Sequence, residues 1–401
     1  MKKSLIAVAV ASAFAAPVAM AEVTLSGAIN IGIEVAKSSS APANALFGTG
    51  ATNGLTRTLL NSNYSHIDIE SVDDIGGGNK VIFHYQLVAA PQNVGTAGGP
   101  FNRNSFLGVA GGWGAFKMGT NENVYERFMY TADPLDGALG PGGNLMILGT
   151  PGLGTAFDAG QTGCGPAGTG AGCIGFYRRT DQTIWYESPS FSGFTFEVDY
   201  TLSAFKQNSS TSPSGVSYDP KVLSVGGKFQ PEGAPFYIDV AVERHEDMFA
   251  LNAINGPLSA TSSKDTAAQI GGGWMFGDLG LHLRYERLTY KADGVVAGGV
   301  REYKRDAGWI GVKYNLPSGY VGAELGIARD GKADGVKAAD TGAKMFGIGY
   351  FHNLSKQSQL QFIYGRTDNK ANATYVQAAA PLGGLPGSDH QVFHVGLKHT
   401  Y

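Results

Sequence analysis

The chain has 401 residues, of which 16% are charged and 11% aromatic, and its 59 glycines are about twice the usual share. A soluble protein of this length would carry about a quarter charged residues, so the composition argues against an ordinary soluble domain. The 30 basic residues are balanced by 33 acidic ones, for a net charge of −3 at pH 7. That balance argues against nucleic-acid binding, which needs a concentrated basic surface.

The first 21 residues have the pattern of a signal peptide. Lys2 and Lys3 precede an apolar run over residues 5–18, and Ala19-Met20-Ala21 supplies the small residues of a cleavage site. We therefore expect residues 1–21 to be removed and the mature chain to begin at Glu22. A single uncleaved membrane helix is the alternative, although the run is short for one. No other stretch of 18 consecutive apolar residues occurs, which excludes a helical membrane protein.

From residue 22 to residue 401, short runs with period-two hydrophobicity alternate with clusters of Gly, Asn, Asp, Ser and Pro. In residues 23–35 the apolar side chains fall on odd positions and the polar ones on even positions, and the same alternation recurs in 279–286, 360–364 and 393–398. Each run therefore predicts a strand with one apolar and one polar face. About sixteen such strands are expected, centred near residues 29, 67, 84, 106, 116, 184, 197, 225, 240, 272, 284, 309, 325, 346, 363 and 396.

The connections between these strands alternate between short turns, such as 277–278 and 317–319, and long polar segments, such as 203–219 and 369–388. Short periplasmic turns and long external loops are typical of transmembrane barrels. In hydrocarbon every backbone N–H and C=O must be satisfied internally, so strands can span only as a closed barrel. We therefore predict an all-β fold over residues 22–401, a transmembrane antiparallel β-barrel wide enough to leave an aqueous lumen. A soluble β-sandwich or propeller is the alternative, with shorter strands and a more charged outer face.

One connection, residues 120–177, is too long for a simple loop and so indicates a function. We expect it to fold into the lumen and to narrow it, because its many glycines allow tight packing against a barrel wall. It holds a single base, Arg127, before residue 178. Its acidic residues are Glu122, Glu126, Asp133, Asp136 and Asp158.

Basic residues should face this acidic loop across the pore. Arg103, Arg178 and Arg179 flank strand starts near it, and Arg57 lies before the second strand. Opposed charges of this kind set up the field by which pores sort ions. The alternative is that some of these arginines are external surface charges or pair with lipopolysaccharide.

Two cysteines, Cys164 and Cys173, lie in the same Gly-rich segment. In an oxidising periplasm a local disulfide is the simplest reading, and it would stiffen the second half of the loop. A metal site is the rival, but it lacks nearby His or further Cys. No GxSxG or HExxH pattern occurs, so the sequence predicts no catalytic residue, no metal ligand and no cofactor.

Several segments resemble the Gram-negative trimeric porins, especially the beta-proteobacterial type. They are Val23–Gly27, Arg103–Val109, Gly114–Gly119, Asp133-Pro134, Arg179–Pro189, Tyr350–Lys356 and the final Tyr401. The resemblance covers the whole mature chain and implies a homotrimer, an inward-folded third loop and, in anion-selective members, an arginine ladder.

In that ladder Arg103 and Arg179 stand at two family positions. His66 stands where the family often has Arg on the second strand, and histidine carries less charge at neutral pH. Thr120 replaces a usual Arg, and the cysteine pair is not a general family feature. These departures leave the charge preference of the channel open.

We therefore expect a multi-pass protein of the Gram-negative outer membrane that forms a water-filled channel for small hydrophilic solutes and ions. Its expected partners are further copies of the chain, outer-membrane lipid and lipopolysaccharide, and not nucleic acid. A substrate-specific channel is the alternative, and a barrel enzyme or a plugged adhesive barrel are less favoured ones. An enzyme would need a Ser and a His joined by a motif, and the sequence offers none.

Overall fold

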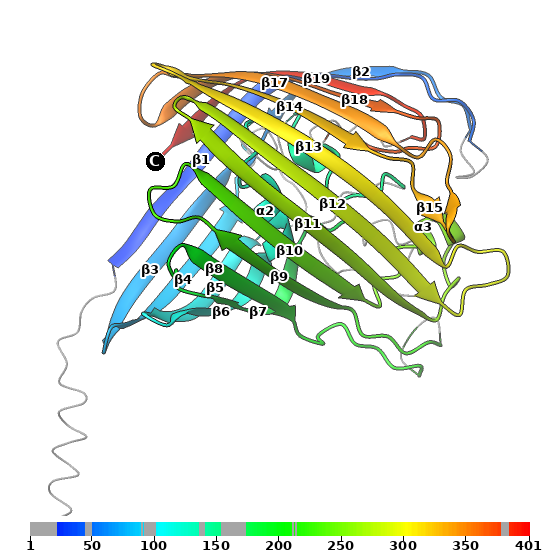
Figure 1. Ribbon diagram of the computed structural model, residues 1–401, viewed down its shortest axis with the longest axis horizontal. Helices are drawn as coiled ribbons and strands as arrows, with labels where there is room; N and C mark the ends of the chain where they lie inside the picture. The colour runs from blue at the N-terminus through cyan, green and yellow to red at the C-terminus, as the bar shows by residue number, and fades with distance from the viewer. Residues whose placement is uncertain are drawn as a thin grey trace, which may run out of the picture.

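The computed structural model describes residues 22–44, 50–89, 91, 102–135, 141–153, 174–210, 212, 215–377 and 385–401. The predicted signal peptide, residues 1–21, lies outside them. The described strands form one antiparallel sheet that closes on itself, because β1 pairs with β19 on one side and with β2 and β3 on the other (Figure 1). Among the described residues, no helix is long and apolar enough to cross a membrane.

The strands are β1 (Glu22–Ser38), β2 (Leu55–Ser62), β3 (His66–Gly76), β4 (Asn79–Val88), β5 (Asn102–Gly111), β6 (Gly114–Glu122), β7 (Arg179–Glu187), β8 (Phe194–Thr201), β9 (Lys221–Phe229), β10 (Phe236–Glu246), β11 (Ser262–Phe276), β12 (Leu279–Asp293), β13 (Glu302–Leu316), β14 (Gly319–Ala328), β15 (Lys332–Ala333), β16 (Val336–Lys337), β17 (Ala343–Asn353), β18 (Ser358–Asn369) and β19 (His390–Thr400).

Sixteen strands form the wall, as the sequence predicted, when β2 and β3 are counted as one strand and β15 and β16 are left out. β2 and β3 pair with successive halves of β1, so they act as one wall strand interrupted at residues 63–65. β15 and β16 are strands of two residues each, which form a small hairpin beside the start of β13. Each of the sixteen predicted strand centres falls within one of these wall strands. The all-β barrel is therefore confirmed.

The period-two alternation separates the two faces of the wall. On β1, Val23 and Leu25 are 68% and 63% exposed on the outside, whereas Glu34 and Ala36 on the other parity are fully buried inside. Residues paired across antiparallel strands point to the same face, so the register carries this assignment around the whole barrel.

The connections differ in length at the two ends, and the start of β1 and the C-terminus lie at the end with the short turns (Figure 1). The turn between β3 and β4 is among the tightest, since β3 continues to Gly76 and β4 begins at Asn79. Gly76, Gly77 and Gly78 have φ values of 84°, 63° and 77°, which residues with a Cβ rarely adopt. Three glycines in succession therefore allow the wall to reverse at once.

The described parts of the connection between β6 and β7, residues 123–135, 141–153 and 174–178, lie inside the barrel, and the inward-folded third loop is confirmed. It runs over residues 123–178, rather than 120–177, because β6 continues to Glu122. It contains α2 (Val124–Tyr130) and the short helix η1 (Asn144–Met146). Its apolar side chains join inward residues of β10–β17 in one buried cluster, so part of the lumen is filled by a core.

Candidate functional site

Inward glycines let the third loop lie directly against the wall. A Cβ on Gly226 of β9 would come within 2.4 Å of Val124 on α2, and one on Gly322 of β14 would come within 2.2 Å of the Pro134 carbonyl oxygen. A Cβ on Gly347 would meet Leu135 at 2.4 Å, and one on Gly365 the Gly142 nitrogen at 2.4 Å. The loop therefore lies against a row of inward-facing glycines that runs from β9 to β18.

A buried ion pair fixes the middle of the loop. Glu286 on β12 accepts hydrogen bonds from Tyr125 Oη at 2.8 Å and from the Gly149 N–H at 2.9 and 2.8 Å. Arg305 on β13 donates to Glu286 at 2.5 Å and to the Ile147 carbonyl oxygen at 2.9 Å. Glu286 and Arg305 are both fully enclosed, so their charges are compensated chiefly by each other and by loop atoms.

The last long connection also enters the barrel and holds the loop from the external side. The Thr374 N–H donates to the Gly152 carbonyl oxygen at 2.9 Å, and Gln377 Oε1 accepts from the Gly142 N–H at 2.8 Å. Tyr375 is buried against Gly152, where an added Cβ would lie 2.0 Å from its ring. Residues 374–377 therefore clamp the third loop between themselves and the wall.

On the other side of the lumen, the sequence-predicted basic residues join a chain of polar contacts across β3–β7. His66 Nε2 lies 3.2 Å from Asp68, whose other oxygen accepts from Gln86 at 2.8 Å. Arg103 donates from Nε to Gln86 at 3.0 Å, and its NH2 lies 3.5 Å from Glu122.

Arg179 completes this chain at the start of β7. It pairs with the same Glu122 carboxylate, and its Nε donates to Asn104 at 3.2 Å. The Arg179 side chain is 23% exposed, whereas that of Arg103 is 7% exposed. The structure thus brings Arg103, Arg179 and Glu122 together, with Glu122 beside the arginines at the end of β6 rather than opposite them.

The remaining described acidic residues of the loop have other neighbours. Glu126 is buried on α2, and burial raises its pKa to about 8. Asp133 accepts hydrogen bonds from the Leu135 and Asn144 N–H groups, both at 2.8 Å, and so shapes the turn that follows α2. Asp136, Asp158 and the cysteines Cys164 and Cys173 lie outside the described residues.

The other two predicted arginines lie away from Glu122. Arg178 is buried, its NH1 is 3.8 Å from Met248 Sδ, and burial lowers its pKa to about 10. Arg57 on β2 is exposed and pairs in register with Ala36, so it lies on the lumenal face toward the external end. Among the described residues, no group of three or more His, Cys, Asp or Glu side chains could hold a metal ion.

Sequence reasoning missed Asp68, Gln86, Glu286, Arg305 and Tyr375. The first four could have been placed on the lumenal face by strand parity, which is readable from the sequence. Their partners could not, because they depend on strand register and on the packing of the third loop, which brings Tyr125 and Ile147 to β12 and β13. Tyr375 lies in the connection between β18 and β19, where no strand alternation indicates which way a side chain points.

A closed sixteen-strand wall with a long loop packed inside it matches known proteins. The model of a family described as Gram-negative porin matches residues 7–372. The chain belongs to the Gram-negative porin family. Outer membrane porin protein 32 of Delftia acidovorans is 26% identical over the full length of both chains, and a Bordetella pertussis outer membrane porin is 23% identical, covering 91% of this chain and 94% of that one.

Among solved structures, the anion-selective porin from Comamonas acidovorans superposes with a TM-score of 0.71 at 21% identity. The match covers 95% of this chain and 100% of that one, and at this identity the likeness supports the fold. The protein is therefore a porin of the Gram-negative outer membrane, a channel for passive diffusion.

Proposed function

We propose that this porin is a general diffusion channel for small hydrophilic solutes, with its narrowest section between the third loop and the β3–β7 wall. The observation that carries the proposal is the exposed part of Arg179, next to the buried Arg103 and Glu122, on the wall strands beside the end of α2. Partly solvated guanidinium groups at a narrow section attract anions and repel cations. Neutralised in part by Glu122, they would give a modest preference rather than a strict filter.

We propose that Asp133, Asp136 and Asp158 contribute the acidic side of this constriction. Glu126 does not, because burial raises its pKa to about 8 and leaves it largely uncharged at neutral pH. Arg57 and His66 extend the basic side, whereas Arg178 is buried and lines no part of the pore. Stepwise, ohmic conductance after addition of purified protein to a planar lipid bilayer would support the channel. A barrel that inserts and conducts no ions would refute it, and would favour a plugged or enzymatic barrel instead.

A substrate-specific channel is the second candidate, favoured by the clamp at residues 374–377, which adds to the filling of the lumen. Measuring conductance at increasing concentrations of small organic anions distinguishes a general channel from a substrate-specific one. A general channel gives current in proportion to bulk conductivity, whereas a specific one saturates at a binding constant.

We also propose that the porin assembles as a homotrimer, contacts lipopolysaccharide and has no catalytic activity. One related solved structure, that of OmpT from Vibrio cholerae, is described as a trimer form. Native mass spectrometry of the detergent-solubilised protein should give three times the mass of the mature chain. A monomeric mass under conditions that preserve conductance would contradict the trimer.

A further proposal is that Cys164 and Cys173 are bonded to each other. The supporting observation is their closeness in sequence within a segment exported to an oxidising compartment. Mass spectrometry of the non-reduced protein should find one disulfide-linked peptide. Two free thiols would refute the bond.

A further inference from the structure

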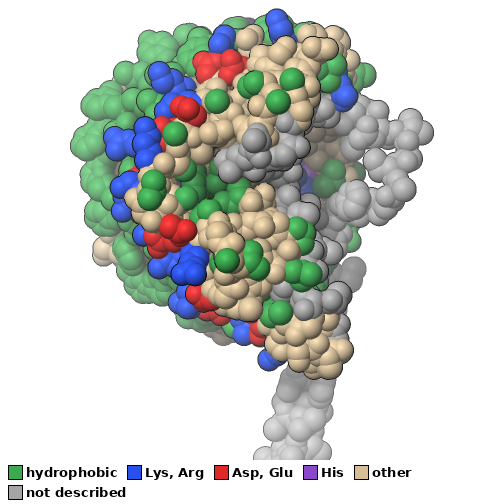
Figure 2. Space-filling model, turned by 90° about the vertical axis from the view of Figure 1, so that its right-hand side faces the viewer, with side chains coloured by type: hydrophobic (Ala, Val, Ile, Leu, Met, Phe, Trp, Pro, Cys, Tyr) green, Lys and Arg blue, Asp and Glu red, His purple; other side chains and the backbone are tan. Residues whose placement is uncertain are grey.

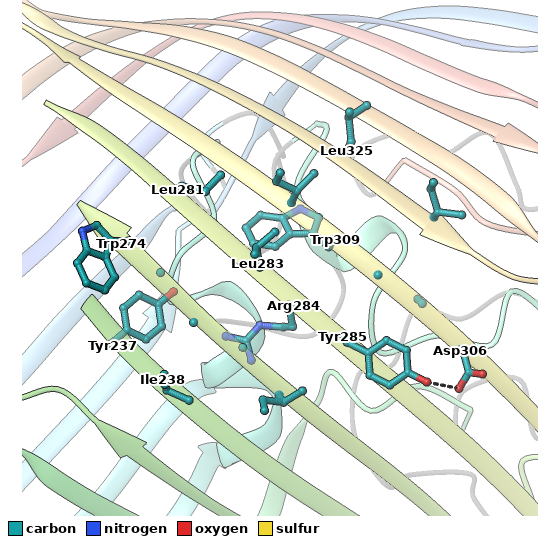
Figure 3. Close-up of a pocket in the computed structure, with 18 of the residues that line it drawn as sticks. Tyr237, Ile238, Trp274, Leu281, Leu283, Arg284, Tyr285, Asp306, Trp309 and Leu325 are labelled. Atoms are coloured by element: carbon teal, nitrogen blue, oxygen red, sulfur yellow. Dashed lines mark hydrogen bonds between the residues drawn. The ribbon is translucent and has the colours of Figure 1, made fainter. Parts of the chain in front are cut away.

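The outer face of the barrel carries an apolar groove over β10–β14, with a volume of about 1090 Å³ (Figure 3). Its floor lies at two outward positions without side chains. Gly272 on β11 pairs with Ile238 and Leu283, and Gly308 on β13 pairs with Tyr285 and Ile327. Further lining residues are Ile270, Ile310 and Leu325. The groove is therefore a depression between rows of branched apolar side chains.

The groove changes in polarity along the barrel axis. At the end nearer the short turns it is lined by Trp274 and Phe236, whose rings stack at 5.2 Å. At the end nearer the long connections, Tyr285 Oη donates to Asp306 at 2.9 Å (Figure 3). Arg287 Nε donates to the same carboxylate at 2.7 Å. The groove is therefore apolar toward the short turns and polar toward the long connections.

A second pocket, of about 750 Å³, continues the groove at its polar end and shares Ile327 and Arg329 with it. Five basic side chains line this pocket against two carboxylates, those of Asp330 and Asp368. The basic residues are Arg329, Lys332, Lys337, Lys344 and Lys370. Figure 2, which looks onto the external end, shows Lys and Arg side chains gathered along one side of the rim.

Part of this positive charge is uncompensated. Lys337 and Lys370 both pair with Asp330, at 3.1 and 2.8 Å. Arg329, Lys332 and Lys344 are exposed and form no ion pair with any described residue. A pocket with an excess of three positive charges at the membrane–water boundary is suited to phosphate groups.

We propose that the groove and the basic pocket together bind a phosphorylated, acylated glycolipid of the outer leaflet. Its acyl chains would lie in the groove, and its phosphates would lie among Arg329, Lys332 and Lys344. The inference rests on the proposed function, which places the long connections outside the cell, and it gives the lipopolysaccharide contact a location. A phospholipid of the periplasmic leaflet fits less well, because its phosphate would lie at the short-turn end of the barrel, away from Arg329, Lys332 and Lys344.

The test measures binding of bisphosphorylated lipid A to the purified, detergent-solubilised porin by native mass spectrometry. Replacing Arg329, Lys332 and Lys344 together by Gln should weaken binding about tenfold or more, since each basic residue near an anionic lipid surface contributes measurably. Gly308→Leu should weaken it as well by filling the groove floor. A Cβ at Gly308 would meet no atom closer than 4.0 Å, so this change fits without a backbone clash.

The matched control is Arg244→Gln, which removes an exposed outward base on β10 that pairs with Glu246 and lies outside both pockets. Its binding should equal that of the wild type. Equal binding by the triple variant, equal binding of lipid A without phosphates, or displacement of lipid A by millimolar inorganic phosphate would overturn the proposal.

Planar-bilayer conductance of the same preparations separates this proposal from the channel. The triple variant and Gly308→Leu change only outward positions and should conduct as the wild type does, which also shows that they fold. Normal conductance with unchanged lipid A binding would overturn the lipid site alone. An absence of conductance in the wild type would overturn the channel whatever the lipid result.

Discussion

Replacing Arg305 by Met should loosen the third loop inside the barrel. Methionine keeps much of the side-chain volume but removes the guanidinium that donates to Glu286 at 2.5 Å and to the Ile147 carbonyl oxygen at 2.9 Å. Glu286 would then remain enclosed, with only Tyr125 and the Gly149 N–H as partners. Breaking a buried ion pair from one side costs about 3–5 kcal/mol, because a buried charge is left uncompensated.

The lost free energy weakens the attachment of the third loop to the wall. It leaves the wall itself intact, because the wall strands keep their own hydrogen bonds. A free energy of about 3 kcal/mol corresponds to a change of about a hundredfold in the ratio of detached to attached loop. Single-channel recordings should therefore show more open-channel noise and frequent brief changes of conductance. The matched control is Lys304→Met, a neighbouring position whose side chain points outward and is 44% exposed.

A double variant makes the reasoning sharper. Adding Glu286→Gln to Arg305→Met removes the uncompensated charge while keeping an acceptor for Tyr125, so the double variant should be quieter than Arg305→Met alone. Recordings of Arg305→Met as quiet as those of the wild type would refute the anchoring role. If the extra noise of the double variant equals the sum of the extra noise of the two single variants, Arg305 and Glu286 do not act as a pair.

Three further changes should alter the pore in distinct ways. Replacing Arg103 and Arg179 together by Gln should move the zero-current potential in a salt gradient toward cation preference, by removing two positive charges beside Glu122; an unchanged potential would place them outside the constriction. Tyr375→Ala should raise single-channel conductance by releasing the external clamp, and an unchanged conductance would assign the clamp no part in pore width. Because burial raises the pKa of Glu126 to about 8, attachment of α2 should be complete below about pH 4.5 and weaken as pH rises through 8. Open-channel noise should follow that curve in the wild type and be flat in Glu126→Gln, whereas equal pH dependence would contradict the assignment.

The wall strands could be predicted because each carries its own local signal. Val23, Leu25 and Ile33 alternate with Thr24 and Glu34, and this alternation alone specifies which side chains face lipid and which face the lumen. The unusual length of the third connection likewise indicated an inserted loop, and its boundaries shifted only because β6 continues to Glu122.

The contacts inside the lumen could not be predicted in the same way. Composition suggested acidic loop residues opposite basic wall residues, whereas the structure places Glu122 on the wall between Arg103 and Arg179. Asp133 is engaged by backbone N–H groups and so shapes a turn. Glu122 meets Arg179 only because β7 pairs with β6 across the third loop, and Asp133 meets Asn144 only because the loop turns back after α2.

The sequence by itself determined a sixteen-strand barrel, its two faces, its two ends and the insertion of its third loop, because strand parity and connection length are local properties. Only the tertiary structure decided which part of the lumen is filled by the third loop and which wall carries the charged side chains. Barrel closure brings Glu286 to Tyr125 and Tyr375 to Gly152, and it joins the outward glycines to the basic rim above them. These distances follow from register and curvature, which the spacing of residues along one chain does not encode.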